Sequence, residues 1–172
     1  MLQARGALEG SPFITAYPDD LHFGDVPLAK QLIEAYEETG CSVLATLHDP
    51  PEMLRYAILE LAADNLHVTD MIEKPASMEL APSREASIGR FLYTPDIFEY
   101  LEEGWNQHTG GEYYHVYALK KLMERNRVVY SRVRGTRLDT GAPEGYFQAI
   151  LRYAADNPKL RSMLLSEAAR LG

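Results

Sequence analysis

Strand-forming and helix-forming patterns alternate along almost the whole 172-residue chain. Runs rich in strand formers lie at residues 12–17, 42–47, 89–93 and 128–133, and amphipathic helical spacing separates them, as in residues 28–39. Helices that connect strands cover the faces of the sheet, so this order predicts an α/β fold with a mixed, mainly parallel sheet and flanking helices. We expect residues 1–172 to form a single domain, since the chain is too short for two ordinary ones.

The remaining segments complete the expected order. Residues 56–61 and 66–72 are predicted to be two strands joined by a short turn, and residues 74–86, which contain two prolines, are predicted to be a loop. Helices are expected at residues 95–103, 112–124 and 144–155, and again from Asn157-Pro158 to near Leu171.

Charge and hydropathy exclude several classes of protein. The net charge is −8, from 25 acidic and 17 basic residues, which argues against a nucleic-acid-binding surface. No apolar run approaches the roughly 18–20 residues of a membrane-spanning helix, and the N-terminus shows no apolar core of a signal peptide. Cys41 is the single cysteine and cannot form an internal disulfide. We therefore expect a cytoplasmic protein without nucleic-acid or membrane partners.

The first candidate site follows the first predicted strand, which ends in Tyr17-Pro18-Asp19-Asp20. Open α/β sheets bind ligands beyond the carboxyl ends of their strands, where a carboxylate can hold Mg²⁺ together with phosphate oxygens. An ordinary surface turn is the alternative, because Pro, Asp and Asp are common turn residues.

Two further motifs contain charged residues at the ends of elements. In Glu73-Lys74-Pro75, a glutamate able to accept hydrogen bonds from sugar hydroxyls precedes a lysine able to neutralise a phosphate; a solvated charge pair is the alternative. In Asp139-Thr140-Gly141, the aspartate is a candidate second metal carboxylate, and an ordinary helix-entry turn is the alternative.

Other chemical patterns are weaker. The five histidines show no metal-site spacing, and no Ser-His-Asp or Cys-His arrangement emerges. We expect Tyr113 and Tyr114 to pack within the fold.

The order of the motifs is more specific than any one of them. They are Pro18-Asp19-Asp20, Arg55-Tyr56-Ala57, Glu73-Lys74-Pro75, Ile88-Gly89-Arg90-Phe91, Gly110-Gly111-Glu112, Leu138-Asp139-Thr140-Gly141 and Gly145-Tyr146. This series resembles the C-terminal two-thirds of bacterial UTP–glucose-1-phosphate uridylyltransferases, and more broadly the sugar-1-phosphate nucleotidylyltransferases. The resemblance covers nearly the whole chain.

The resemblance implies roles for particular residues. Asp19 and Asp139 match the aspartates that hold Mg²⁺ in that family, while Glu73 matches the residue that binds the glucose hydroxyls. Lys74 matches the residue that binds the sugar phosphate, so Asp19, Lys74 and Asp139 are the expected catalytic residues.

The same resemblance implies the shape of the sugar pocket. Tyr56 and Ala57 match a turn that brings backbone close to the hexose, with Ala57 in place of the usual glycine. Gly89 matches a glycine in the strand that floors the pocket. The segment that follows Gly110-Gly111-Glu112 departs from the family pattern, in a part of the family fold that lies near the sugar pocket or the subunit contact.

The resemblance further implies a nucleotide-diphospho-sugar transferase-like, or Rossmann-like, fold. It also implies an activity that joins glucose 1-phosphate to UTP, giving UDP-glucose and pyrophosphate, with Mg²⁺ as cofactor. The glycine-rich loop that cradles the nucleotide in this family is not among these residues. We therefore expect a fragment that is inactive alone and a homo-oligomer in which other surfaces cover the open sheet edge.

Three alternatives stay open at this point. The chain can be related to an enzyme that uses another nucleotide or another sugar, because the segment that selects the base is not in the sequence. It can be a non-catalytic binding domain derived from such an enzyme. It can also require a second polypeptide to complete its site.

Overall fold

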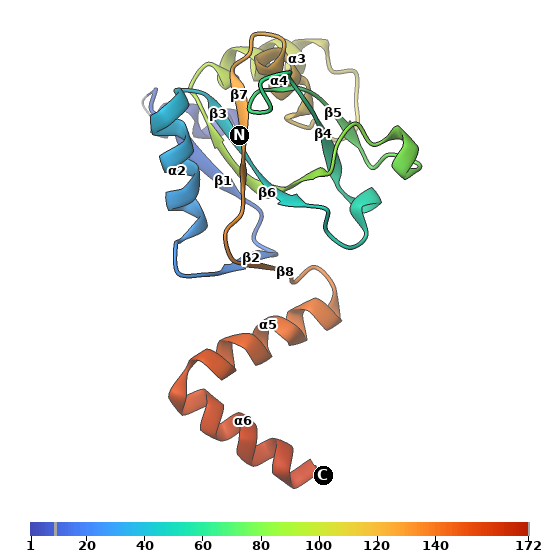
Figure 1. Cartoon of the computed structure of the whole chain (residues 1–172). Coiled ribbons are helices and arrows are strands. Elements are labelled where there is room, and N and C mark those ends of the chain that lie inside the picture. Colours follow the sequence, from blue (N-terminus) through green and yellow to red (C-terminus); the bar gives the residue numbers. More distant parts are fainter. Residues whose placement is uncertain (9, 172) are drawn as a thin grey trace.

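The computed structural model describes residues 1–8 and 10–171 as a sheet with helices on both faces and two C-terminal helices that extend away from it (Figure 1). The strands are β1 Phe13–Ala16, β2 Asp20–Phe23, β3 Ser42–His48, β4 Ala57–Leu61, β5 Val68–Glu73, β6 Glu85–Tyr93, β7 Val128–Arg132 and β8 Thr136–Asp139. The α-helices are α1 Arg5–Leu8, α2 Leu28–Thr39, α3 Ile97–Gln107, α4 Val116–Met123, α5 Pro143–Asp156 and α6 Pro158–Leu171. Short 3₁₀ helices lie at Leu2–Ala4, Met53–Arg55 and Met78–Leu80.

Strand β6 is the centre of the main sheet, whose order is β5-β4-β6-β3-β7 with β1 paired to β6. Strand β3 pairs along most of one edge of β6, so β1 and β4 must share the other edge. There β4 pairs with Ala86 and Ser87, while β1 pairs with residues 90–93. Among the described strands, none therefore pairs with this edge of β6 at Ile88 and Gly89.

The mixed α/β fold is confirmed, but the expected predominance of parallel pairs is wrong for the described strands. Only β3 and β7 pair in parallel; the other pairings of the main sheet are antiparallel. The connection between β4 and β5 is short, and a short connection reverses the chain into an antiparallel pair. Strand β6 runs against β3, β4 and β1 alike.

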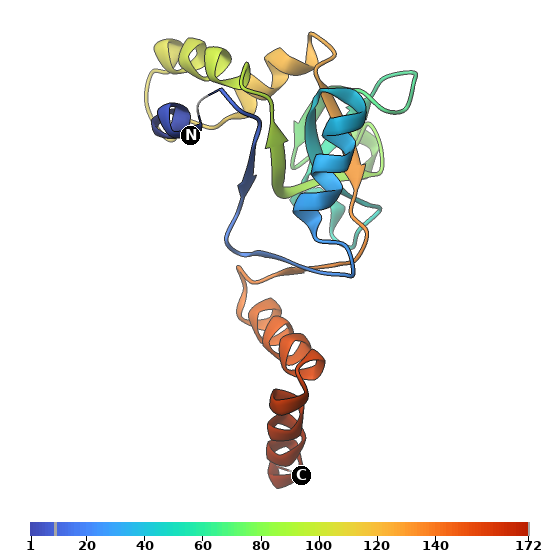
Figure 2. The same ribbon diagram turned by 90° about the vertical axis from the view of Figure 1, so that its left-hand side faces the viewer.

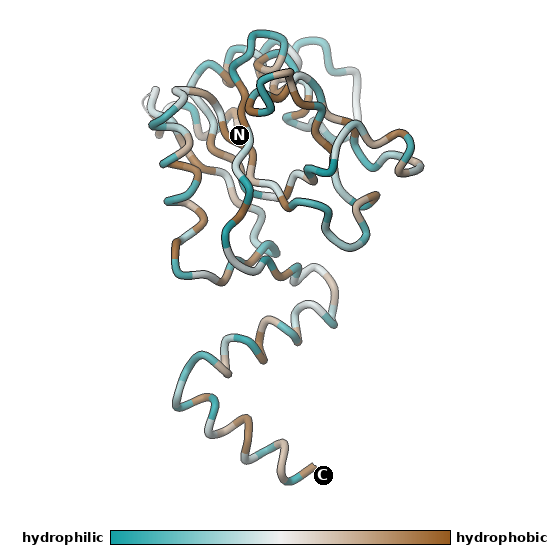
Figure 3. The backbone as a smooth tube through the Cα atoms, viewed as in Figure 1, coloured by the Kyte–Doolittle hydropathy of each residue, from teal (hydrophilic) through white to brown (hydrophobic). Residues whose placement is uncertain are grey.

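The two faces of the sheet carry separate cores. Phe91 and Tyr93 of β6 pack with α3 and α4 on one face, while Val43 and Leu92 pack with Leu32 of α2 on the other. Figure 2 shows α2 on the opposite side of the sheet from α3, and Figure 3 shows brown, apolar segments along the strands and helices of this body. Successive side chains of β6 point to opposite faces of the sheet, so this one strand contributes residues to both cores.

Two short strands were not expected from the sequence. β2 and β8 form an antiparallel ribbon in which Asp20 is opposite Asp139 and Phe23 is opposite Thr136. We expected Pro18-Asp19-Asp20 to end the first strand, and Asp139-Thr140-Gly141 to lead into the helix at residues 144–155. Strands of four residues that pair across more than a hundred positions leave no local pattern, so periodicity missed them.

Some boundaries also differ from the prediction. Strand β6 begins at Glu85, inside the expected end of the loop, and α4 begins at Val116, after the expected start at residue 112. Within the described residues, no helix combines the length and the apolar composition that crossing a lipid bilayer requires.

A candidate active site between two strands

A cleft of about 740 Å³ opens at the gap between β1 and β4 on the edge of β6. The C-terminal end of β1 faces it, in keeping with the tendency of α/β sheets to bind ligands beyond the carboxyl ends of strands, and the start of β4 lies on its other side. Its lining residues come from five strands, from helix α4 and from the segments beside these elements: Tyr17, Asp19, Asp20, Arg55, Tyr56, Ala57, Glu73, Lys74, Ser87, Ile88, Gly89, Phe91, Tyr114, His115, Val116, Arg137 and Asp139.

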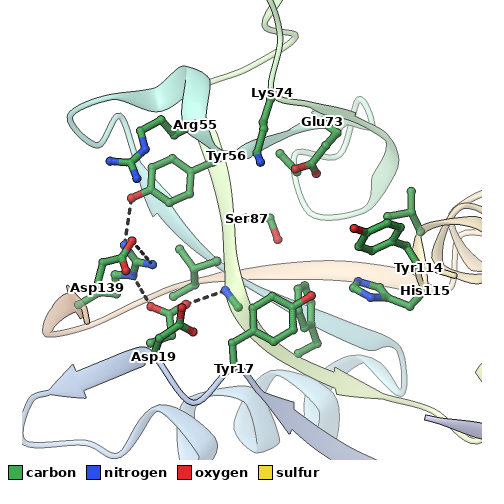
Figure 4. A pocket seen from close by; sticks show the side chains of 17 residues that line it. Tyr17, Asp19, Arg55, Tyr56, Glu73, Lys74, Ser87, Tyr114, His115 and Asp139 are labelled. Atoms are coloured by element: carbon green, nitrogen blue, oxygen red, sulfur yellow. Dashed lines mark hydrogen bonds and ion pairs between the residues drawn. The ribbon is translucent and has the colours of Figure 1, made fainter. Parts of the chain in front are cut away.

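The structure brings together all the candidate residues named from the sequence. Asp19, Tyr56, Ala57, Glu73, Lys74, Gly89 and Asp139 line this one cleft (Figure 4). They span 120 positions of the chain, so the sheet and not their sequence spacing makes them neighbours. Their individual roles remain predictions.

Asp19 and Asp139 lie close together because the β2–β8 ribbon pairs the segments that hold them. The backbone N–H of Thr140 donates to the Asp19 carbonyl at 2.8 Å, and the Gly141 N–H donates to the Asp139 carboxylate at 2.9 Å. A Cβ at Gly141 would lie 3.1 Å from a carboxylate oxygen of each aspartate. These two oxygens are therefore within twice that distance of each other, and glycine leaves the space beside them open.

The two carboxylates suit a hard divalent cation. Mg²⁺ prefers oxygen ligands and commonly uses one or two carboxylates together with substrate phosphates and water. Among residues 1–8 and 10–171, no group of three or more His, Cys, Asp or Glu side chains could hold a metal by itself. The pair Asp19 and Asp139 thus has the donor chemistry for Mg²⁺ that is bound jointly with a phosphate.

Glu73 and Lys74 face the cleft together although they are consecutive. Strand β5 ends at Glu73, and Lys74 adopts a left-handed conformation with φ of 45°. The Lys74 N–H donates to the carbonyl of Tyr56 at 3.1 Å, which fixes this change of direction. In a regular strand the two side chains would point to opposite faces, so the left-handed residue is what lets both reach one ligand.

Arg137 is a cleft residue whose role the sequence did not indicate. Its guanidinium forms an ion pair with the buried carboxylate of Asp20, donates to the Tyr56 hydroxyl at 3.0 Å and lies 3.3 Å from the Asp139 carboxylate. Asp20 also accepts the Gly89 N–H at 2.8 Å. Arg137 therefore connects the carboxylate side of the cleft with its Tyr56 wall. The sequence alone did not single out Arg137, because the residues that it contacts are known only once the pairing of β8 is known.

Aromatic rings form the wall that faces Glu73. The Tyr17 and Phe91 rings meet edge to face at 6.1 Å, and the His115 ring lies 5.2 Å from Phe91. Burial, followed by the negative charges of Glu73 and Asp19, raises the pKa of Tyr17, and burial lowers the pKa of His115. At neutral pH this wall is uncharged and suits the apolar face of a ring.

Tyr114 was expected to pack within the fold, and this prediction is wrong. Its side chain is 58% exposed and lines the cleft, with its hydroxyl donating to Glu112 at 2.7 Å. Tyr113 is half-buried and donates to the Leu101 carbonyl at 2.9 Å. The two adjacent tyrosines therefore lie in different environments: Tyr114 lines the cleft, and Tyr113 is hydrogen-bonded to α3.

The sequence of the chain also matches a known protein family. A family model described as nucleotidyl transferase matches residues 2–156. This chain belongs to the nucleotidyl transferase family. The sequence-based expectation that the chain belongs to a nucleotidyltransferase family is confirmed.

Individual relatives agree with this assignment. The nucleotidyl transferase chain is 34% identical to UTP–glucose-1-phosphate uridylyltransferase 2 of Staphylococcus saprophyticus, over 98% of this chain and 59% of that protein. The corresponding enzyme of Staphylococcus haemolyticus is 32% identical with the same coverage. The chain thus spans about three fifths of the length of these curated relatives.

Solved structures show the same fold. A UDP-glucose pyrophosphorylase complexed with UDP-glucose is 33% identical with a TM-score of 0.75, over 91% of this nucleotidyl transferase chain and 61% of that chain. The enzyme of Acinetobacter baumannii has a TM-score of 0.84 over 99% of this chain and 60% of that one. At 22% identity, the second likeness shows the fold alone.

Proposed function

We propose that the cleft binds glucose 1-phosphate and Mg²⁺ and forms the sugar-phosphate side of a UTP–glucose-1-phosphate uridylyltransferase. The observation that carries this proposal is the convergence of Asp19, Asp139, Glu73 and Lys74 on one cleft. The match to uridylyltransferases over almost the whole chain supports it.

The cleft residues have distinct tasks in this proposal. Glu73 accepts hydrogen bonds from sugar hydroxyls, and Lys74 holds the sugar phosphate through its ammonium group. A phosphate oxygen of the sugar attacks the α-phosphorus of UTP. The bond from that phosphorus to the pyrophosphate oxygen breaks as pyrophosphate leaves. No protein nucleophile is required, so positioning and charge neutralisation carry the catalysis.

Mg²⁺, when bound, supplies positive charge that neutralises the phosphate oxygens as the bond is exchanged. Asp19 and Asp139 would hold it. The open space beside Gly141 and the exposed Asp19 carboxylate leave room for phosphate oxygens at the same place.

Assembly and location complete the proposal. Within the described residues β1 pairs with β6 alone, and open strand edges favour pairing with another chain. Helices α5 and α6 expose Phe147, Tyr153 and Leu165. We therefore propose a homo-oligomer in the cytoplasm, where the buried thiol of Cys41 stays reduced. Sedimentation as a monomer would count against the oligomer, and recovery in a secreted fraction would count against the location.

Lys74→Ala tests the proposed function most simply. The Lys74 side chain is exposed and makes no ion pair with any residue in the described part of the chain, so its loss should leave the thermal midpoint unchanged. The affinity for glucose 1-phosphate should fall about 10- to 100-fold, because a charge-assisted hydrogen bond to the phosphate is lost.

Isothermal titration of glucose 1-phosphate into wild-type and variant chains measures this change. Lys159→Ala, at an exposed position on α6, is the matched control and should bind like the wild type. Equal affinity of the Lys74 variant and the wild type would refute the role of Lys74.

A further inference from the structure

The floor of the cleft contains a polar group that the proposed function has not used. Ser87 lies on β6 at the middle of the cleft and is only 8% exposed. Its hydroxyl oxygen is buried and has no hydrogen-bond partner among residues 1–8 and 10–171. Buried hydroxyls are almost always paired in folded proteins, so an unpaired one beneath a cleft needs an explanation.

The register of the sheet places Ser87 in a row with Glu73. Glu73 pairs with Ala57 across β5 and β4, and Ala57 pairs with Ser87 across β4 and β6. Residues paired across antiparallel strands point to the same face, and neighbouring strands lie about 4.8 Å apart. Glu73 and Ser87 therefore flank the methyl group of Ala57, roughly 10 Å apart at the backbone.

The row of Glu73, Ala57 and Ser87 suits a sugar ring that places one hydroxyl near Glu73 and another near Ser87. Ala57 and Gly89 are the small residues beside Ser87, so the space above the floor stays open. Figure 4 shows Ser87 at the centre of the labelled side chains, with Glu73 and Lys74 on one side and Tyr17 on the other. Rotation about χ1 gives the Ser87 hydroxyl alternative staggered positions from which it can meet a ligand.

We infer that Ser87 is a specificity-determining residue that hydrogen-bonds one hydroxyl of the sugar, on the side of Ala57 opposite to Glu73. The inference rests on the proposed function, since it requires a sugar phosphate in this cleft. It assigns the chain a preference for a fully hydroxylated hexose over the analogue that lacks this one hydroxyl.

Ser87→Ala tests the inference through two measurements, the thermal midpoint and the affinity for glucose 1-phosphate, which should change differently. Removal of an unpaired buried hydroxyl should leave the thermal midpoint of the ligand-free chain unchanged or higher. The affinity for glucose 1-phosphate should fall about five- to tenfold, because one neutral hydrogen bond is lost. Ser87→Cys, which is slightly larger and forms only weak hydrogen bonds, should lose a similar factor, and the exposed Ser162→Ala should lose nothing.

The hydroxyl concerned is found with the four monodeoxy analogues of glucose 1-phosphate at positions 2, 3, 4 and 6. For one of these analogues, the affinity of the wild type should equal the affinity of Ser87→Ala for glucose 1-phosphate. Ser87→Ala should bind that same analogue as tightly as the wild type does. Double-mutant cycles of this kind isolate a single pairing.

Each other outcome contradicts the inference in a recognisable way. Equal binding of glucose 1-phosphate by wild type and Ser87→Ala would overturn the inference and leave the proposed function standing. A lower thermal midpoint together with an equal loss for every analogue would show a structural role only. No binding of glucose 1-phosphate by the wild type would overturn the proposed function and, with it, the inference.

Discussion

Gly89 is the residue whose size most directly controls the shape of the cleft. A Cβ at this position would lie 2.5 Å from the Tyr17 ring and 2.9 Å from the Asp20 carboxylate. Both neighbours are held in place, because Tyr17 donates its backbone N–H to the Gly89 carbonyl and Asp20 is paired with Arg137. A larger residue must therefore move groups that line the cleft.

We predict that Gly89→Ala lowers the free energy of unfolding by about 1–3 kcal/mol and weakens glucose 1-phosphate binding. The control is Gly6→Ala in α1, where an added Cβ meets nothing within 4 Å and alanine favours a helix. Urea denaturation of both variants measures the difference. A Gly89 variant as stable as the Gly6 variant would show that the close packing around Tyr17 is not required.

Residue identity alone predicted part of the site, and the reason differs from residue to residue. Asp19, Glu73, Lys74 and Asp139 follow predicted strands or precede a helix, which are positions where ligands bind, so their motifs were visible. Ser87 lies inside a buried strand, and a serine there has no pattern that separates a ligand contact from a core residue. Its importance depends on its neighbours in the sheet.

At the scale of elements, Glu85 ties three strands together at one end of the main sheet. Its carboxylate accepts hydrogen bonds from Thr46 at 3.0 Å and from Arg132 at 2.6 Å, and it lies 2.6 Å from the His48 ring. Burial acts to raise the pKa of Glu85, but the hydrogen bonds from Arg132, His48 and Thr46 outweigh it and the pKa is lowered. The ionised form is thus favoured in the folded chain.

This lowered pKa predicts a stability contribution that is fully present above pH 4.5, the ordinary value, and is lost as the pH falls through the lowered value. Glu85→Gln should lose on the order of 1–3 kcal/mol at pH 7 and should show a weaker dependence on acid than the wild type. Thermal midpoints between pH 7 and pH 3 measure both effects. If the thermal midpoints of the wild type and of Glu85→Gln fell by the same amount as the pH decreases, Glu85 would not be the source of the loss of stability in acid.

Helices α2 and α5 and strand β3 were predicted well because each has its own periodic pattern, and α2 was predicted at its observed bounds. The β2–β8 ribbon and the antiparallel direction of β6 were missed, because both depend on pairing between distant segments. The ribbon is nevertheless what brings Asp19 to Asp139. Element prediction therefore indicated the parts of the site but could not show how they meet.

At the scale of the whole molecule, the 172 residues correspond to about three fifths of the uridylyltransferases that they match. The glycine-rich loop expected to hold the nucleotide is not among them. Nucleotidyl transfer depends on placing the triphosphate, and a loss of about 4 kcal/mol in the transition state already slows a reaction roughly a thousandfold.

We therefore predict that the purified 172-residue chain releases no pyrophosphate from UTP and glucose 1-phosphate in the presence of Mg²⁺. A coupled pyrophosphate assay measures this, with a full-length uridylyltransferase as the positive control. Turnover by the chain alone would contradict the prediction, and it would mean that these residues bind the nucleotide by themselves.

The central claim is that one cleft binds the sugar phosphate and a metal ion together. A crystal structure of the chain grown with glucose 1-phosphate and Mg²⁺ tests it most directly. We predict a metal ion about 2.0–2.1 Å from oxygens of Asp19 and Asp139, with the phosphate at Lys74 and the ring between Glu73 and Ser87. A sugar phosphate bound elsewhere, or Asp19 and Asp139 without a shared metal ion, would contradict the claim.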